Sequence, residues 1–162
     1  MAEIYLSLGS NIGDRRKYLM QAVGKLKTRL DDSRVSYIYA TKPWGNQDQP
    51  EFLNLCMSGK TSLTAMELFK FTSSIEKQLG RTKKEKWGPR EIDIDILFYG
   101  DEVIKTQNLK IPHPFIAERA FVLVPLAEIA PDFVHPVLRL TASKLASAID
   151  TSGVRIFSDE KI

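Results

Sequence analysis

Two aspartates separated by a single residue lie in an apolar stretch near the middle of the chain. From Trp87 to Gly100 the sequence reads WGPREIDIDILFYG, in which Asp93 and Asp95 alternate with isoleucines. Such alternation is typical of a β-strand, where residues two apart point to one face, about 6.6–6.8 Å apart. Two carboxylates this close repel each other unless a cation compensates their charge. Because Mg²⁺ prefers carboxylate oxygens and completes its shell with phosphate oxygens, the pair predicts a magnesium site.

A basic segment comes directly before the aspartates. Residues 81–90, RTKKEKWGPR, contain five basic side chains and one acidic one. Cations of this kind bind phosphate groups, so the segment and the aspartates together favour a polyphosphate bridged by metal. The sequence contains neither GxxxxGK[ST] nor GxGxxG, and side chains must therefore hold the phosphates. The alternative is a solvated basic loop, with the aspartates paired to lysine or arginine of a neighbouring strand.

These residues must be positioned by regular elements, and the pattern up to residue 100 predicts which ones. Apolar alternation predicts strands at 3–9, 33–40, 51–60 and 91–98, with a turn at Gly9–Asn11. The first helix is indicated by apolar residues at helical spacing: Leu19, Ala22, Val23, Leu26 and Leu30. A capping box from Thr64 to Glu67 opens the second helix, which ends at Gly80. The order β-α-β-β-α-β predicts an α+β, ferredoxin-like sandwich.

The chain beyond Gly100 shows less regular patterning. Five prolines interrupt residues 112–136, and only one short helix, at 141–149, is expected. We predict an irregular C-terminal extension of the same domain, without a core of its own. At 162 residues, the sequence predicts one domain spanning 1–162.

Composition limits the possible classes of protein. The formal net charge is only +3, and no apolar run approaches the roughly 20 residues of a membrane span. Cys56, the single cysteine, excludes an internal disulfide and is expected to be a buried, inert thiol. The N-terminus lacks the features of a signal peptide. We expect a soluble, cytoplasmic monomer without nucleic-acid or membrane partners.

Several motifs, in chain order, resemble those of 6-hydroxymethyl-7,8-dihydropterin pyrophosphokinases. They are LGSNIGD at 8–14, TKPWGNQDQPEFLN at 41–54, GR at 80–81, WGPRxxDxDI at 87–96 and PHPxxxxRxF at 112–121. The match extends from the first strand to about Pro131. The resemblance implies a folate-pathway enzyme that moves a pyrophosphoryl group from ATP to the pterin hydroxymethyl oxygen and releases AMP. It also implies two Mg²⁺ ions.

The resemblance assigns roles to particular residues. Asp93 and Asp95 would hold the two magnesium ions, with Arg81 and Arg90 as further catalytic residues at the phosphates. The residues that would bind ATP are Glu76, Lys83, Lys84, Ile96, His113 and Arg119. The residues that would bind the pterin are Thr41, Pro43, Trp44, Phe52, Asn54, Trp87 and Phe121.

Reasoning from the residues alone supports some of these roles and leaves others open. Phe52 and Asn54 share one face of a predicted strand, where they offer an aromatic plane and an amide, the groups that a pterin needs. An edge position facing water remains the alternative for Asn54. Phe121 by pattern is a core residue. A solvated role is open for Glu76 and a structural one for His113.

Two other functions fit a ferredoxin-like sheet. An RNA-binding module would need a K/R-G-F/Y-G/A-F-V-x-F/Y strand, which the sequence lacks, and an acidic strand face would repel a phosphate backbone. A two-metal phosphohydrolase would use the same aspartates but would transfer phosphate to water. Product analysis distinguishes the three possibilities.

Overall fold

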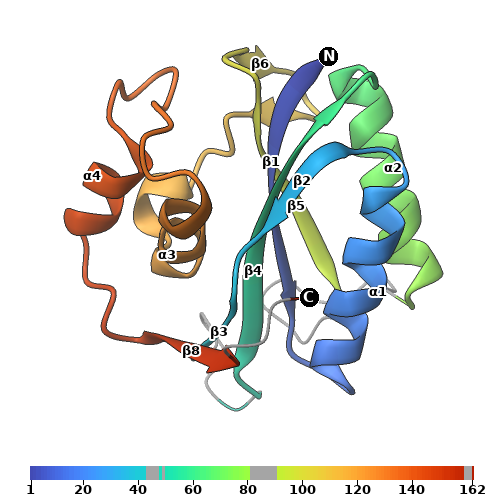
Figure 1. The fold of residues 1–162 in the computed structure, drawn as a ribbon, viewed down its shortest axis with the longest axis vertical. Helices are drawn as coiled ribbons and strands as arrows, with labels where there is room; N and C mark the ends of the chain where they lie inside the picture. The colour runs from blue at the N-terminus through green and yellow to red at the C-terminus, as the bar shows by residue number, and fades with distance from the viewer. Residues whose placement is uncertain (43–47, 49, 81–90, 159–161) are drawn as a thin grey trace.

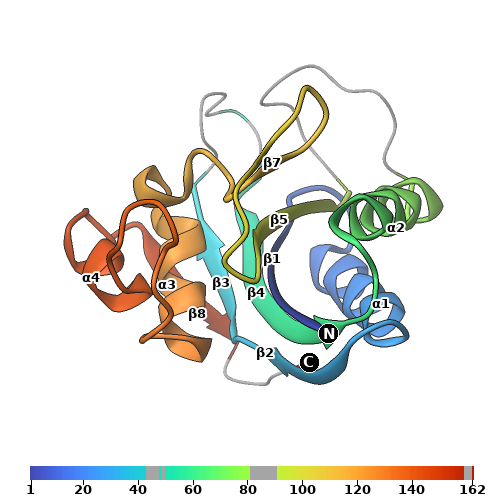
Figure 2. The same ribbon diagram turned by 90° about the horizontal axis from the view of Figure 1, so that it is seen from above.

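An antiparallel sheet separates two layers of helices (Figures 1 and 2). The computed structural model describes residues 1–42, 48, 50–80, 91–158 and 162. The strands of the sheet are β1 (Ala2–Ser10), β2 (Asp31–Val35), β3 (Ile38–Thr41), β4 (Phe52–Thr61), β5 (Asp93–Tyr99) and β8 (Val154–Ser158). Their order is β5-β1-β4-β3-β8, and β2 pairs with β4. A small hairpin is formed by β6 (Ile104–Lys105) and β7 (Lys110–Ile111).

Helices α1 (Arg15–Lys27) and α2 (Ala65–Gln78) cover one face of the sheet (Figure 1). The predicted capping box of α2 is present, because Thr64 and Glu67 each accept the other's backbone N–H. Gly80 has a φ of +97°, the left-handed conformation expected just past a helix end. The apolar stripe of α2 packs with that of α1 and the alternate residues of β1, β4 and β5 in one core.

The second face is covered by the C-terminal part of the chain. A 3₁₀ turn, η1 (Ile116–Glu118), leads into α3 (Ala120–Ile129), and α4 (Ala142–Ser147) follows. Their apolar residues form a second buried cluster with Tyr5, Cys56 and Phe98 of the sheet. Cys56 is fully buried there, and burial raises the pKa of its thiol, as expected for an inert cysteine.

The predicted α+β, ferredoxin-like class is confirmed, and the elements up to residue 100 follow the predicted order except that the second strand is divided into β2 and β3. The prediction for the C-terminal extension is wrong. The segment is not irregular, because α3 and α4 build a core and β8 joins the sheet beside β3. Only α4 was expected. Pro125 lies inside α3. Because a proline normally interrupts a helix, the local sequence pattern did not predict one here.

Residues 33–40 form two strands instead of the single predicted one. Ser36 donates its backbone N–H to the carbonyl of Cys56 and accepts the N–H of Cys56 at Oγ. The next residue, Tyr37, turns its N–H away from the sheet to the Glu128 carboxylate of α3, at 3.0 Å. A side chain from the second helical layer thus takes the place of a strand partner and interrupts the ladder.

Strand β1 runs further than the predicted turn at Gly9–Asn11 allowed. Gly9 lies within the strand, between Asn54 of β4 and Asp93 of β5. The N-cap of α1 is Asp14, whose carboxylate accepts the N–H of Lys17. Gly9 therefore lies near the end of an inner strand, between two residues predicted to be functional.

Candidate active site

The two aspartates of β5 point to one face of the sheet, as predicted from their spacing. Asp93 and Asp95 are partly exposed, whereas Ile94 and Ile96 are buried on the other face. Between the two aspartates, the backbone N–H of Ile94 donates to Glu76 Oε2 of α2 at 2.8 Å. Glu76 is itself buried, so the alternative of a solvated glutamate is wrong. Its contact holds β5 against α2.

His113 and Arg119 converge on Asp95. The Nε2 atom of His113 and the Nη1 atom of Arg119 each lie 3.9 Å from Asp95 Oδ2. Both side chains come from the segment between β7 and α3, where the backbone N–H of His113 donates to the carbonyl of Leu97 on the edge strand β5 at 3.1 Å. The fold thus brings together three predicted site residues that are up to 24 positions apart in the sequence.

His113 is a neutral donor at physiological pH. Burial, and then the charge of Arg119, lowers its pKa to about 4. Its Nδ1 atom accepts the backbone N–H of Phe115 at 3.2 Å, so the ring proton resides on Nε2, the atom nearest Asp95. His113 accordingly contributes a directed N–H without a positive charge.

Arg119 supplies the charge. Its guanidinium carbon lies 5.2 Å from the ring centroid of Phe115 and 5.6 Å from that of Phe121. Stacking against two aromatic rings holds the planar guanidinium in a set direction, which suits a group that must bind phosphate oxygens.

Two clefts meet at this cluster. The smaller, about 300 Å³, is lined by Phe69, Ile94, Asp95, Ile96, Gln107, Asn108, Leu109, Lys110, His113 and Pro114. The larger, about 470 Å³, is lined by Thr41, Lys42, Phe115, Glu118, Arg119, Ala120, Phe121, Asp150, Gly153 and Val154. Asp95 borders the first and Arg119 the second, so the 3.9 Å contact between them marks the junction.

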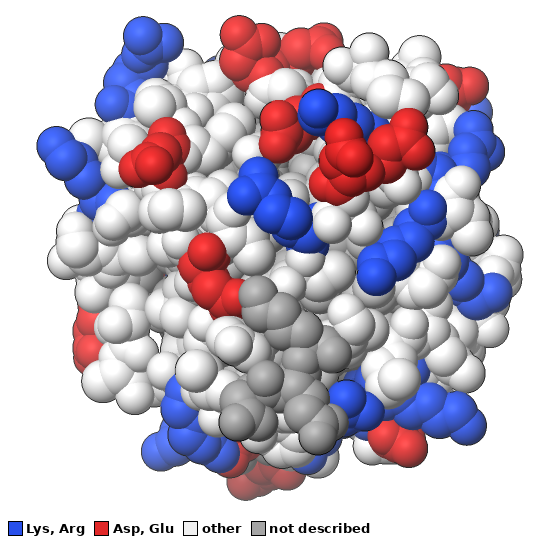
Figure 3. Space-filling view, viewed as in Figure 1, with Lys and Arg blue, Asp and Glu red and all other residues white. Residues whose placement is uncertain are grey.

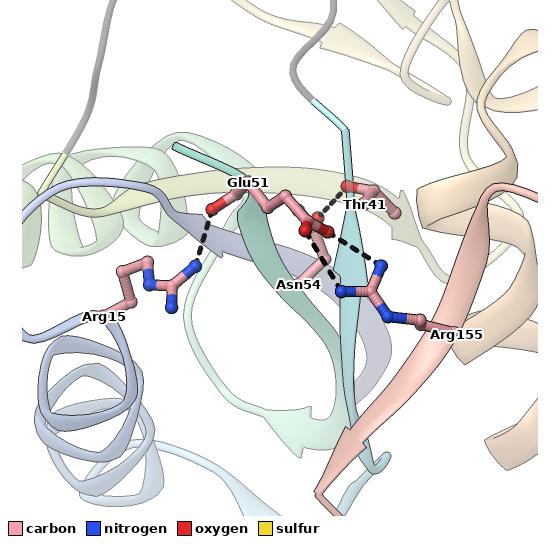
Figure 4. Close-up of polar contacts among 5 residues, drawn as sticks. All are labelled: Arg15, Thr41, Glu51, Asn54 and Arg155. Atoms are coloured by element: carbon pink, nitrogen blue, oxygen red, sulfur yellow. Dashed lines mark hydrogen bonds and ion pairs between the residues drawn. The ribbon is translucent and has the colours of Figure 1, made fainter. Parts of the chain in front are cut away.

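A buried polar pair lies beside the larger cleft (Figure 4). Thr41 Oγ1 donates to Asn54 Oδ1 at 3.0 Å, and the two residues are only 5% and 4% exposed. Asn54 is therefore not an edge residue facing water. Its Nδ2 atom lies over Gly9, where an added Cβ would come within 2.7 Å of it and 3.6 Å of Phe52 Cδ1. Phe52 and Asn54 thus share one face, as predicted, across a gap that Gly9 leaves open.

The donor atoms suit magnesium. Within residues 1–42, 50–80 and 91–158, no three His, Cys, Asp or Glu side chains gather as a complete metal cage. In many Mg²⁺ sites the protein provides only one or two carboxylate ligands, and phosphate oxygens and water complete the coordination. Asp93 and Asp95 fit that pattern.

Seven of the predicted site residues lie outside the described part of the chain. They are Pro43, Trp44, Arg81, Lys83, Lys84, Trp87 and Arg90. The other ten are all placed: Asp95, Ile96, His113, Arg119, Thr41 and Phe121 line the two clefts, Asp93, Phe52 and Asn54 adjoin them, and Glu76 lies beneath β5.

Comparison with known sequences identifies the fold's family. The family model of 7,8-dihydro-6-hydroxymethylpterin-pyrophosphokinase (HPPK) matches residues 5–131. The chain belongs to the HPPK family. Among its relatives is the 2-amino-4-hydroxy-6-hydroxymethyldihydropteridine pyrophosphokinase of Aquifex aeolicus, 50% identical over 139 residues, which cover 86% of this chain and 87% of that protein. The Bacillus subtilis protein of the same name is 44% identical over 158 residues, which cover 96% and 90%.

Solved structures agree on the fold. The wild-type HPPK-DHPS of Plasmodium falciparum, crystallised with pteroate, superposes with a TM-score of 0.74 at 18% identity. The match covers 91% of this chain but only 42% of that one. At this identity the likeness concerns the fold alone. Among the helices in the described part of this chain, none has the length and apolar character needed to cross a bilayer.

Sequence reasoning missed some residues at the site. Phe69, Leu109 and Lys110 line the smaller cleft, and Val154 of β8 lines the larger one. None belongs to a motif. Lys110 lies three residues before His113, and a search for cations near that motif would have found it, whereas no local signal marks Val154.

Proposed function

We propose that the chain transfers pyrophosphate from ATP to 6-hydroxymethyl-7,8-dihydropterin in folate biosynthesis, giving AMP and the pterin diphosphate. The observation that carries this conclusion is the junction of the two clefts at Asp95 and Arg119, 3.9 Å apart. A nucleotide in the smaller cleft and a pterin in the larger one would present the triphosphate and the hydroxymethyl group to each other at that point.

ATP occupies the smaller cleft in this proposal. Ile96 lines its apolar wall, and His113 offers the Nε2–H to a phosphate oxygen. Arg119 supplies positive charge from the side of the pterin, where the β-phosphorus is attacked. These residues orient the triphosphate for in-line attack and stabilise its charge, which are the main protein contributions in phosphoryl transfer.

The pterin occupies the larger cleft and extends to Asn54, which lies beside the cleft and accepts a hydrogen bond from its lining residue Thr41. The amide of Asn54 recognises the ring edge, and its orientation is set by the hydroxyl of Thr41. Phe52 and Phe121 come from β4 and α3 and supply aromatic planes for the ring. The buried Thr41–Asn54 pair favours a fixed recognition edge over an adaptable one.

Asp93 and Asp95 are the residues that would hold two magnesium ions with ATP. Bound there, the ions would neutralise charge on the triphosphate. Their carboxylates lie on one face of β5 because strand residues two apart point the same way, and the hydrogen bond from the Ile94 N–H to Glu76 holds the strand against α2. The number of ions is part of the proposal.

Roles for the residues outside the described ranges rest on the family motifs. Arg81 and Arg90 are proposed to act at the phosphates as catalytic residues, with Lys83 and Lys84 binding ATP. Pro43, Trp44 and Trp87 are proposed to complete the pterin pocket.

We further propose one domain over residues 1–162, acting as a cytoplasmic monomer. The pairing of β8 with β3 in the common sheet supports the single domain. On the face drawn in Figure 3, the described Lys and Arg side chains are interspersed with Asp and Glu, in contrast to the basic stripe of a nucleic-acid surface.

The test is nucleotide product identification with and without the pterin alcohol. The proposed transferase forms AMP and pterin diphosphate only when ATP, Mg²⁺ and the pterin are all present. A hydrolase would release product from ATP with water alone, and a binding module would release none. Either of those results would contradict the proposal.

A further inference from the structure

The C-terminal strand β8 reaches the larger cleft from beyond the residues that match the family model. The family model ends at residue 131, whereas β8 begins at Val154. Val154 pairs with Thr41 in the β3–β8 ladder and, together with Gly153, lines the cleft. Part of the wall of the proposed pterin site is therefore made by residues to which the motifs assign no role.

An ion pair ties β8 to the beginning of β4 (Figure 4). The guanidinium of Arg155 donates to both carboxylate oxygens of Glu51, with Nη1–Oε2 at 2.8 Å and Nη2–Oε1 at 3.1 Å. Two parallel hydrogen bonds fix direction as well as distance. The hydrogen-bonded guanidinium holds the pKa of the Glu51 carboxyl below its usual range, so the pair remains charged at neutral pH.

Helix α1 joins the same contact. Arg15, its first residue, donates from Nη1 to the backbone carbonyl of Glu51 at 2.9 Å. The guanidinium carbon of Arg15 also lies 5.7 Å from the ring centroid of Phe157 on β8. Elements α1, β4 and β8 therefore meet at Glu51, one residue before Phe52.

Thr41 lies between the two strands that this contact joins. It pairs with Phe52 of β4 on one side and with Val154 of β8 on the other. Its hydroxyl in turn sets the amide of Asn54. Because β8 is an edge strand with β3 as its ladder partner, the Arg155–Glu51 pair gives it a second attachment at the end nearest the cleft.

We propose that the Arg155–Glu51 pair positions Thr41 and Asn54 for the pterin, which makes β8 a functional part of the substrate site. This inference rests on the proposed function. Arg155 acts here as a positioning residue, because it works through Thr41 and is not among the residues that line either cleft. The proposal predicts an effect on pterin recognition that is separate from ATP recognition, since the smaller cleft contacts neither β4 nor β8.

The alternative is that this exposed ion pair contributes only to the stability of the sheet and has no specific effect on the pterin site. The side chains of Arg155 and Glu51 are 61% and 37% exposed, and pairs of this kind contribute little to global stability. The chain offers a matched control at the far end of β4, where Lys60 and Asp32 form another exposed pair at 3.7 Å. Removing either pair should leave the fold intact, so only the proposed role distinguishes them.

The experiment compares Arg155→Ala, Arg155→Lys and Lys60→Ala with the parent protein by steady-state AMP formation. For Arg155→Ala we expect the pterin KM to rise about tenfold while the ATP KM changes less than about twofold. Arg155→Lys keeps the positive charge but cannot form two parallel hydrogen bonds to the carboxylate. Its pterin KM should therefore lie between those of the parent and Arg155→Ala. Lys60→Ala should leave both KM values unchanged. If Arg155→Ala does not fold, the Arg155→Lys variant supplies the comparison.

Several outcomes would overturn the inference. These are an unchanged pterin KM in both Arg155 variants, an equal rise of the pterin and ATP KM values, or the same change in Lys60→Ala. An active parent with any of these results leaves the proposed function standing. A parent protein that forms no AMP in the presence of pterin would refute the proposed function and this inference together.

Discussion

Replacing Gly9 by alanine tests the geometry of the proposed pterin site. A Cβ at this position would lie 2.7 Å from Asn54 Nδ2, so the amide must retreat by roughly 0.7 Å to reach an ordinary contact of 3.4 Å. Asn54 cannot retreat freely, because Thr41 Oγ1 holds its Oδ1 atom at 3.0 Å in a buried site. The displacement therefore strains or breaks that hydrogen bond.

The expected magnitude follows from the cost of a lost buried hydrogen bond. Leaving a buried acceptor without its donor costs about 1–3 kcal/mol, and about 1.4 kcal/mol corresponds to a tenfold change in affinity. Since Asn54 would recognise the pterin edge, Gly9→Ala should raise the pterin KM by about tenfold or more and leave the ATP KM unchanged. A stability loss of about 1 kcal/mol would lower the melting temperature by about 2–4 °C.

Gly24→Ala is the matched control. Gly24 lies in α1 with no atom within 4 Å of an added Cβ, so the same methyl group enters open space. Alanine in a helix is about 0.5–1 kcal/mol more favourable than glycine, and the variant should be slightly more stable with unaltered kinetics. Steady-state AMP formation at varied pterin and thermal unfolding measure both effects. A Gly9→Ala protein with the parental pterin KM would refute the placement of Asn54 at the pterin.

Three other perturbations have defined outcomes. Asp95→Ala should reduce transfer by roughly 10³-fold or more with an unchanged far-UV CD spectrum; retained turnover would contradict its metal-binding role. Thr41→Val removes the hydroxyl with little change of shape and leaves the acceptor of Asn54 buried, so denaturant unfolding should reveal a loss of about 1–3 kcal/mol; a neutral effect would show that another donor replaces it. Because the pKa of His113 is about 4 in the folded state and 6.5 ordinarily, the unfolded state takes up more protons between these values, and stability falls as pH drops from 6.5 to 4. The His113→Asn protein should lose part of that decrease in pH-dependent unfolding, and an identical profile would refute the burial of a neutral ring.

Much of the fold was accessible from local patterns. The capping box at Thr64 and the end at Gly80 delimited α2 because caps depend on a few adjacent residues. The alternation in β5 correctly separated the faces of Asp93 and Asp95 from those of the isoleucines. Helix α3 was not predicted because Pro125 is unfavourable inside a helix. Packing of its apolar residues against the sheet compensates for that cost.

Some features of the site were likewise predictable from the sequence, whereas others depended on the tertiary structure. Spacing alone paired Phe52 with Asn54, and the motifs nominated His113 and Arg119. Their convergence on Asp95 depends on how the segment after β7 lies along β5. Burial of Glu76 likewise became visible only with the helix in place, because its partner is a backbone N–H 18 residues away.

The sequence by itself determined the family and, apart from the division between β2 and β3, the order of strands and helices up to residue 100, because periodicity, caps and motifs are properties of neighbouring residues. Only the tertiary structure shows that β8 pairs with β3 and that Arg155 forms an ion pair with Glu51, 104 residues earlier. Contacts at such separation depend on how the layers pack around a shared core, and no local spacing encodes them.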